Sequence, residues 1–190
     1  EGIYRILSEN RNVFLFMHLV QSNKDTVTIH AVNSTFYAML IGIAMKYPKN
    51  KLKDLGLGML MLNSGMIQIP AYIMHKQSDL TDRELTQIKS HPILGYRASK
   101  ELGNLPEYAA LISLQHHEQY AGKGYPKGLK GTEISEQARI ASIADNYEAL
   151  IEKRSYRDKQ FFYQAMKNLV SDSAKKFDPV ILRLFISVLS

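Results

Sequence analysis

The chain has 190 residues, of which 45% are hydrophobic and 22% charged, so it is long enough and apolar enough to fold as one ordinary globular domain. It contains no cysteine, which excludes disulfides, thiolate metal sites and cysteine nucleophiles, so any bound metal must be held by nitrogen and oxygen ligands. The formal net charge is +6 at pH 7, but the lysines and arginines are dispersed, so the charge permits an anionic partner such as a nucleotide without indicating DNA binding.

Hydrophobic periodicity predicts an all-α protein. The predicted helices, in chain order, cover residues 1–20, 27–45, 51–62, 81–91, 92–102, 106–117, 135–153, 161–171 and 179–189. Pro48 ends the second helix, and Thr81 with Glu84 three residues later predicts a capping box at the start of the fourth. Residues 67–75 are expected to be an ordered connection, and the Gly-rich segment 122–131 a long loop. No apolar run approaches the roughly 20 residues that span a bilayer, so we expect no membrane insertion and a cytoplasmic location.

Histidines beside the Gly-rich loop are the main candidates for chemistry. His116 and His117 end a predicted helix, where two neutral imidazoles could share a cation. The alternative is two unrelated histidines, because neighbouring side chains diverge on a helix. Asp145 lies in an apolar run, where an unpaired carboxylate is costly to bury, so it faces a cation, pairs with a basic residue or is partly exposed. His91 stands at a helix junction, and His30 lies within an amphipathic helix.

The order of these residues resembles the signature of the HD-GYP family of cyclic-di-GMP phosphodiesterases. The matching residues are His116, His117, Glu118, Gly122, Lys123, Gly124, Tyr125, Pro126, Gly128, Leu129, Gly131, Ile134, Ala138, Arg139, Ile140, Ala144, Asp145, Tyr147, Ala149, Leu150, Arg154, Tyr156 and Arg157. Upstream, His30-Ala31-Val32-Asn33 and Lys89-Ser90-His91-Pro92 resemble further segments of that family. The resemblance implies an all-α, multi-helix HD-GYP-like bundle over residues 26–190. Residues 1–25 are expected to form a connecting helix from an upstream linker.

The resemblance fails at the motif for which the family is named. Aligned on its glycine and proline, the chain has Leu62 where the family has its histidine, Asn63 where it has its aspartate and Met66 where it has its lysine. In the family the aspartate bridges two metal ions, and a bridging carboxylate offsets the repulsion between closely spaced cations. Asparagine has no such charge, leucine has no lone pair, and methionine cannot offer a phosphate a positive charge. The chain therefore resembles a degenerate member with no intact catalytic motif.

The resemblance implies that one of the two family metal positions keeps its histidines. His91, His116 and His117 would hold at most one divalent transition metal ion, which could be iron, zinc, manganese or nickel. Asn63 and Asp145 are further candidate ligands. At the other position only His30 and Asp145 remain. The alternative is that no metal binds and the histidines form a hydrogen-bonded cluster, because a degraded site loses affinity.

The resemblance also implies a ligand site and a docking loop. The expected nucleotide-binding residues are Tyr125, Arg154, Arg157 and Glu148. Arginine suits phosphate recognition, although Arg157 taken alone is equally compatible with a solvated helix end. The expected docking loop, which would meet a protein partner, contains Gly122, Gly124, Tyr125 and Pro126.

Three functions are compatible with these residues. The preferred hypothesis is a module that has lost hydrolysis and binds cyclic di-GMP or docks on a protein partner through the Gly-Tyr-Pro loop. A second is a working cyclic-di-GMP phosphodiesterase with an altered, mononuclear metal site. A third is a structural role within a larger regulator. Metal content, nucleotide binding and phosphodiesterase turnover distinguish the three.

Overall fold

The computed structural model describes residues 26–101, 106–152, 167–171 and 173–189. Its elements are α3 (Thr26–Ala44), α4 (Lys49–Leu60), η1 (Ser64–Gln68), α5 (Ala71–Met74), α6 (Asp82–Ile88), α7 (His91–Glu101), α8 (Glu107–Gln115), η2 (Gly131–Glu133), α9 (Glu136–Glu152), α11 (Ser173–Lys176) and α12 (Pro179–Leu189). Within these ranges the single β contact is an isolated bridge between Ala121 and Lys130. No helix in the described part of the chain has the length and apolar character to cross a membrane. The all-α prediction is confirmed.

Most predicted helices are present close to their expected positions. Thr81 caps α6 as expected: its hydroxyl accepts from the Glu84 amide, and the Glu84 carboxylate accepts from the Thr81 amide at 2.7 Å. Residues 67–75 contain the end of η1 and the single turn of α5, so they are more regular than a plain connection. The predicted helix at 1–20 lies outside the described residues. Of the one at 161–171, only 167–171 is described, and it is helical.

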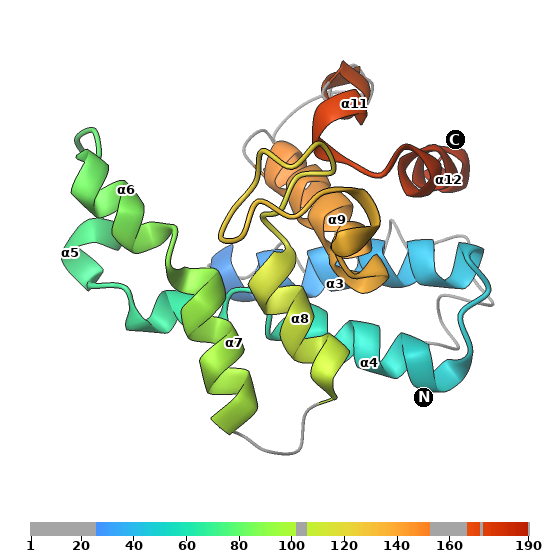
Figure 1. Cartoon of the computed structure of the whole chain (residues 1–190), viewed down its shortest axis with the longest axis horizontal. Helices are drawn as coiled ribbons and strands as arrows, with labels where there is room; N and C mark the ends of the chain where they lie inside the picture. The colour runs from blue at the N-terminus through green and yellow to red at the C-terminus, as the bar shows by residue number, and fades with distance from the viewer. Residues whose placement is uncertain (1–25, 102–105, 153–166, 172, 190) are drawn as a thin grey trace.

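The hydrophobic core lies where α3 packs against α4, α9 and α12, while α8 packs against α4, α7 and α9 (Figure 1). Three aromatic rings lie where α3, α9 and α12 meet. Tyr37 of α3, Tyr147 of α9 and Phe185 of α12 meet edge to face, with ring centroids 4.7 to 6.0 Å apart. Such pairs add specific geometry to the burial of large apolar surfaces. This contact fixes α9 beside α3, and both helices carry candidate site residues.

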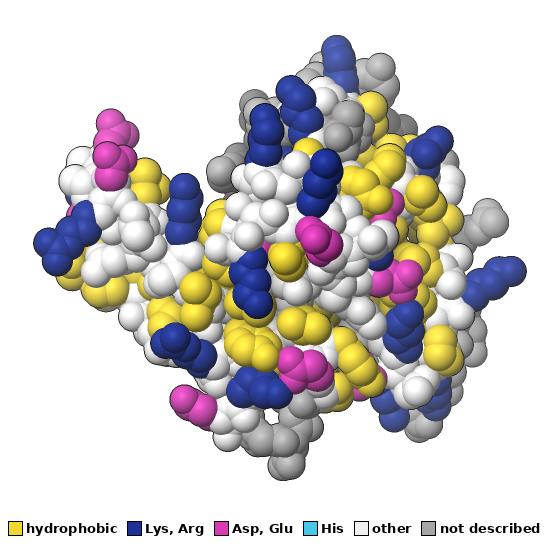
Figure 2. All heavy atoms as spheres, in the orientation of Figure 1, with side chains coloured by type: hydrophobic (Ala, Val, Ile, Leu, Met, Phe, Trp, Pro, Cys, Tyr) yellow, Lys and Arg dark blue, Asp and Glu magenta, His cyan; other side chains and the backbone are white. Residues whose placement is uncertain are grey.

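The α5–α6 segment projects from this body (Figure 1). No residue of α6 is buried. Lys and Arg side chains are scattered over the face seen in Figure 2, with apolar side chains between them. This distribution agrees with the dispersed charge inferred from the sequence.

Glycine allows η1 to lie directly against α7. A Cβ atom added at Gly65 would come within 2.0 Å of the His91 carbonyl oxygen and 2.5 Å of the Gly95 amide nitrogen. A Cβ at Gly95 would in turn come within 2.3 Å of the Ser113 hydroxyl oxygen on α8. Because backbone atoms cannot move away as a flexible side chain can, these glycines set how closely η1, α7 and α8 pack, and so they fix where His91 sits.

Replacing Gly65 with alanine is expected to lower the free energy of unfolding by about 3 kcal/mol, since the new methyl group meets backbone on α7. The matched control is Gly56→Ala in α4, where the added Cβ would lie 3.5 Å from the Met39 sulfur, an ordinary contact. There the gain in helix propensity should leave stability within about 1 kcal/mol of the wild type. Urea denaturation of both variants measures the difference, and equal midpoints would contradict this account of the packing.

Candidate metal centre

His91 is held at the first position of α7, with only 3% of its surface exposed. Its Nδ1 lies 2.7 Å from the carbonyl oxygen of Ile88 at the end of α6. A carbonyl oxygen can only accept a hydrogen bond, so Nδ1 is the nitrogen that carries the hydrogen. The neutral ring therefore presents the lone pair of Nε2 to its other side.

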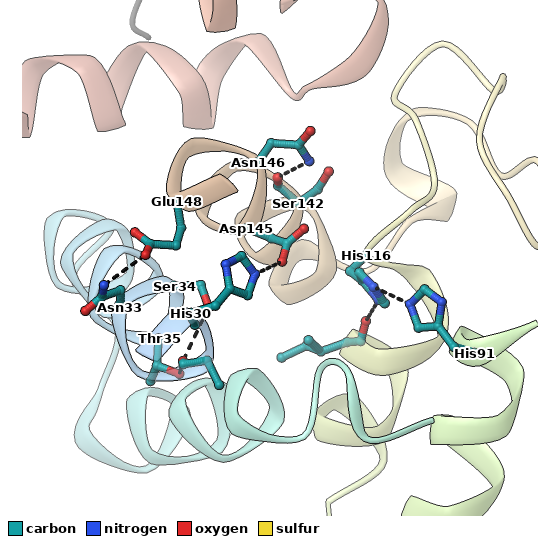
Figure 3. A network of polar contacts seen from close by, with 12 residues as sticks. His30, Asn33, Ser34, Thr35, His91, His116, Ser142, Asp145, Asn146 and Glu148 are labelled. Atoms are coloured by element: carbon teal, nitrogen blue, oxygen red, sulfur yellow. Dashed lines mark hydrogen bonds and ion pairs between the residues drawn. The ribbon is translucent and has the colours of Figure 1, made fainter. Parts of the chain in front are cut away.

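His116 has the same arrangement at the end of α8. It is fully buried, and its Nδ1 donates to the Ser113 carbonyl oxygen at 2.8 Å. Its Nε2 then faces the Nε2 of His91 at 3.2 Å (Figure 3). Two unprotonated nitrogens at this distance repel each other unless a proton or a cation lies between them. Backbone carbonyls that fix the tautomer and direct the lone pair are the usual support of a metal-binding histidine.

His117 completes the cluster. Each of the three histidines offers one ring nitrogen, and the three nitrogens all lie within 4.8 Å of one another. The described residues contain no other group of this kind. Helix α8 ends at Gln115 and His116 is its C-cap, so His117 already lies beyond the regular helix. That is why two adjacent histidines can converge here. This donor set fits one divalent transition metal ion.

Burial keeps these rings neutral. Desolvation, and then the charge of His117, lowers the pKa of His116 to about 3. Desolvation, followed by the charges of His91 and Lys176, lowers the pKa of His117 to about 3. Desolvation also lowers the pKa of His91. A proton is therefore a poor occupant of the space between the nitrogens near neutral pH, whereas a metal ion binds the neutral form that burial favours.

Acid is expected to destabilise the metal-free protein. Histidines in the unfolded chain have an ordinary pKa near 6.5, while burial lowers the pKa of His116 and of His117 to about 3 in the folded protein. Between these values the unfolded chain binds more protons, so stability falls as the pH drops from 6.5 toward 3 and is unaffected by these groups above that window. Each excluded proton contributes a slope of about 1.4 kcal/mol per pH unit. Urea titrations with a chelator from pH 7 to pH 4 measure it, and a flat profile would contradict buried neutral histidines.

His30 and Asp145 meet each other instead of forming a second cluster of three. His30 Nε2 on α3 lies 2.9 Å from Asp145 Oδ1 on α9, and both side chains are largely buried (Figure 3). The charge of Asp145 still reaches the histidine cluster, since it acts to raise the pKa of His116 and of His91 against the effect of burial. The carboxylate of Asp145 is thus paired with His30 while its charge also acts on the histidine cluster.

The three residues at the altered motif occupy different surroundings. Leu62 is 2% exposed and belongs to the hydrophobic core, and its carbonyl oxygen accepts from the Ser113 hydroxyl. Asn63 is half-buried at the N-cap of η1, and Met66 is half-buried within η1. Because η1 packs against α7, this segment borders the helix that carries His91.

The Gly-rich loop is ordered by a buried carboxylate. Glu118 is 2% exposed and accepts from the backbone amides of Lys127 at 2.7 Å and Leu129 at 3.0 Å. Gly122 has φ +80°, which favours glycine at that position. A Cβ at Gly124 would lie 2.3 to 2.5 Å from backbone atoms of residues 117 and 119, so this loop is pressed against the end of the histidine segment. The Tyr125-Pro126 peptide is cis.

Tyr125 brings the loop to the metal centre. Its ring stacks on His117 with centroids 4.8 Å apart and planes 22° apart, and its amide donates to the His117 carbonyl oxygen. Burial, followed by the charge of Asp145, raises the pKa of Tyr125 to about 12, so the phenol remains protonated. A half-buried aromatic face therefore lies directly beside the histidine cluster.

Of the other expected nucleotide-binding residues, Glu148 is the one that the structure describes. Glu148 is 2% exposed, and its carboxylate accepts from the Asn33 side chain at 2.8 Å across the α3–α9 contact (Figure 3). Arg154 and Arg157 lie outside the described residues. Glu118 and Lys89 are among the residues that carry the family resemblance, but no role was predicted for either. Glu118 anchors the loop, and the Lys89 ammonium lies 5.7 Å from the Tyr125 ring centroid. Glu118 follows the histidine pair directly, which was a usable signal.

Comparison with known proteins agrees with the geometry. A family model described as "HD domain" matches residues 15–181. Cyclic di-GMP phosphodiesterase PdeB of Borreliella burgdorferi is 33% identical over 162 residues, which cover 85% of this chain and 42% of that protein. Cyclic di-GMP phosphodiesterase response regulator RpfG of Xanthomonas campestris is 38% identical over 116 residues, or 60% of this chain and 31% of that protein. The chain spans less than half the length of these relatives.

Solved structures show the same fold at lower identity. An HDG"Y"P protein from Bdellovibrio bacteriovorus superposes with a TM-score of 0.77 at 21% identity, covering 99% of this chain and 60% of that one. The HD domain of the L. monocytogenes phosphodiesterase PgpH, in complex with cyclic-di-AMP, gives a TM-score of 0.64 at 13% identity over 98% of this chain and 93% of that one. Because the family model matches residues 15–181, and a relative named a cyclic di-GMP phosphodiesterase is 33% identical over 85% of this chain, the chain belongs to the HD domain family.

Proposed function

We propose that this domain is a degenerate HD-GYP module that binds cyclic di-GMP without two-metal hydrolysis and holds one divalent transition metal ion at His91, His116 and His117. The observation that carries the proposal is the contrast between the two family metal positions. Three imidazoles converge within 4.8 Å at one of them. At the other, Leu62 is packed in the core and His30 is paired with Asp145.

Loss of two-metal hydrolysis follows from the chemistry of the altered motif. Two cations share a site when a carboxylate lies between them and offsets their repulsion. Asn63 brings a neutral amide to that segment, and Leu62 brings no ligand atom. When bound, a single metal ion at the histidine cluster would supply a positive charge for a phosphate oxygen. The residues of this chain would then orient the nucleotide rather than assemble a pair of cations around it.

Tyr125 supports nucleotide binding at this position. Its ring is held parallel to His117, so it offers a flat apolar face for a base or a hydroxyl group for a phosphate beside the metal ligands. Arg154 and Arg157 remain proposed phosphate contacts, and Glu148 remains a proposed nucleotide-binding residue. Relatives that are 33% and 38% identical to this chain are named cyclic di-GMP phosphodiesterases, which supports this cyclic dinucleotide as the ligand.

A calorimetric titration of the metal-loaded protein with cyclic di-GMP tests the proposal, together with a phosphodiesterase assay in manganese, iron, zinc and nickel. Binding without turnover is the expected result. Turnover that disappears in His116→Ala would instead support the second candidate, a phosphodiesterase with a mononuclear site, which the convergence of the three histidines favours. Absence of both binding and turnover would reject both.

The loop gives the proposal a protein-docking branch. Glu118 and the close packing of Gly124 hold residues 122–131 in a defined shape at the surface, which is what a docking segment requires. A pull-down with the wild type, Tyr125→Ala and Gly124→Ala tests this branch. Capture that depends on both residues supports docking. Capture unaffected by either variant removes the loop from the proposal and leaves nucleotide binding to be judged by calorimetry.

A further inference from the structure

Lys89 is a cation at the edge of the histidine cluster that the proposed function has not yet used. It is the C-cap residue of α6, two residues before His91, and it is exposed. Its Nζ lies 5.7 Å from the centroid of the Tyr125 ring. An ammonium group at this distance from an aromatic face is weakly attracted to it, so the long side chain is directed toward the loop without being fixed there.

A short series of contacts connects Lys89 to the metal ligands. Tyr125 lies under the lysine ammonium and stacks on His117, and the ligand nitrogens of His117 and His91 lie within 4.8 Å. The backbone makes a second connection, because the carbonyl oxygen of Ile88, next to Lys89, accepts from His91 Nδ1. Lys89 therefore lies next to the contacts that orient the cluster.

The charge of Lys89 is not neutralised by a neighbour. Some other described lysines form ion pairs with carboxylates; examples are Lys51–Glu136, Lys76–Glu84 and Lys100–Glu107. For Lys89, no carboxylate among the described residues lies within ion-pair distance, while Asp145, whose charge acts on His91 and His116, is paired with His30. The ammonium is thus available to an incoming anion.

The neighbouring segment provides no charge of its own. Element η1 packs against α7, with Gly65 in contact with the His91 carbonyl, but the side chain that follows is Met66. None of the η1 residues, Ser64 to Gln68, carries a charge. The junction of α6 and α7, where Lys89 stands, brings positive charge to the site.

We infer that Lys89 is an anion-anchoring residue, which binds a phosphate oxygen of the ligand beside the Tyr125 ring, at the edge of the histidine cluster. The inference rests on the proposed function, and it adds the contact that positions the phosphate. A flexible ammonium group with three donors is suited to this task, because it can follow a phosphate over several orientations. Its exposure makes the interaction sensitive to salt.

Three substitutions separate charge from packing. Lys89→Ala and Lys89→Met both remove the charge, and the methionine keeps most of the apolar stem beside Tyr125. Lys89→Arg keeps the charge. Lys53→Ala removes a matched exposed lysine from α4. All four variants should unfold at nearly the wild-type temperature, since neither lysine is buried.

Calorimetry with cyclic di-GMP on the metal-loaded proteins should show affinity about tenfold lower in Lys89→Ala and Lys89→Met. The affinities of Lys89→Arg and Lys53→Ala should stay near that of the wild type. Raising the salt concentration should reduce the difference in affinity between the wild type and Lys89→Ala. Wild-type binding with an equally tight Lys89→Ala variant overturns the inference and leaves the proposed function intact. An equally weakened Lys53→Ala variant overturns it as well, because the effect is then one of net charge.

Inorganic phosphate provides an arm that does not depend on cyclic di-GMP. The metal-loaded wild type should bind phosphate more tightly than Lys89→Ala, by a similar factor. If the wild type binds phosphate in this way but not cyclic di-GMP, the proposed ligand is wrong and the anchoring role stands. If phosphate binding is absent or unchanged by Lys89→Ala, the anchoring role is wrong.

Discussion

The variant His116→Ala is expected to lose its divalent metal ion, with the metal content of the purified protein falling from about one per chain to near background. His116 is the central ligand: it is fully buried, its tautomer is set by the Ser113 carbonyl, and its Nε2 lies 3.2 Å from that of His91. Its removal leaves two imidazoles, and we expect the affinity to fall at least about 100-fold, beyond the loss that follows from disturbing a supporting contact.

Elemental analysis of protein purified without a polyhistidine tag measures this loss. A thermal shift provides a second readout, because a ligand at 100 times its dissociation constant stabilises the folded state by about 2.7 kcal/mol. That shift should be present in the wild type and absent in His116→Ala. The matched control is His75→Ala, since His75 is exposed at the end of α5 and should have no effect on metal. A His116→Ala protein with wild-type metal content would overturn the assignment of the cluster.

Restoring the family residues at the altered motif is expected to change both metal content and phosphodiesterase activity. The triple variant Leu62→His/Asn63→Asp/Met66→Lys is expected to bind about two metal ions per chain and to raise phosphodiesterase activity at least about 100-fold over the wild type. The aspartate would provide the bridging charge, the histidine a further ligand and the lysine a phosphate contact. For the second ion to bind, Asp145 must exchange its pairing with His30 for the metal.

Leu62→His alone should be costly. Leu62 is 2% exposed within the core, so an imidazole there loses apolar packing and brings a polar group that lacks a partner, at about 2–4 kcal/mol. Adding zinc or manganese should recover part of this loss in the triple variant but not in Leu62→His. The double variant Asn63→Asp/Met66→Lys serves as the control without the new histidine. A wild type that already hydrolyses cyclic di-GMP as fast as the triple variant would defeat the proposal of lost hydrolysis.

The three sets of variants answer different questions about function. His116→Ala tests whether a metal ion is held at all. The triple variant tests whether the absent ligands account for the absent two-metal chemistry. The Lys89 series tests how a phosphate is held, and it does so without altering a metal ligand. A protein that fails the first test but binds cyclic di-GMP would point to recognition by the loop and its aromatic face alone.

Much of the fold was accessible from local sequence. The apolar periodicity of residues 27–45 and 135–153 predicted the helices that became α3 and α9, because a helix in a protein of this size must bury one face. The capping box at Thr81 and Glu84 involves residues three apart and so needs no tertiary structure. The altered residues Leu62, Asn63 and Met66 could also be identified from the sequence, because the glycine and proline of the motif fix the alignment.

The site depended on long-range packing. His91 and His116 lie 25 residues apart and meet because α7 packs on α8, with glycines permitting the close approach. His30 and Asp145 are separated by 115 residues and meet because α3 packs on α9. Periodicity reports which face of a helix is buried but not which other helix covers it, so neither pairing could be derived from spacing.

The sequence by itself determined the helical class and the positions of the main helices, and it supplied the histidines that are candidates for binding a metal ion. Tertiary structure alone decided that His116 and His117 converge despite being adjacent, since α8 ends at Gln115 and His117 leaves the helical path. It also decided that Lys89 lies over the ring of Tyr125, which is 36 residues further along the chain. The physical reason is common to both: hydrogen bonding and periodicity are local, whereas the direction of a side chain toward a shared site is set by how helices distant in sequence pack together.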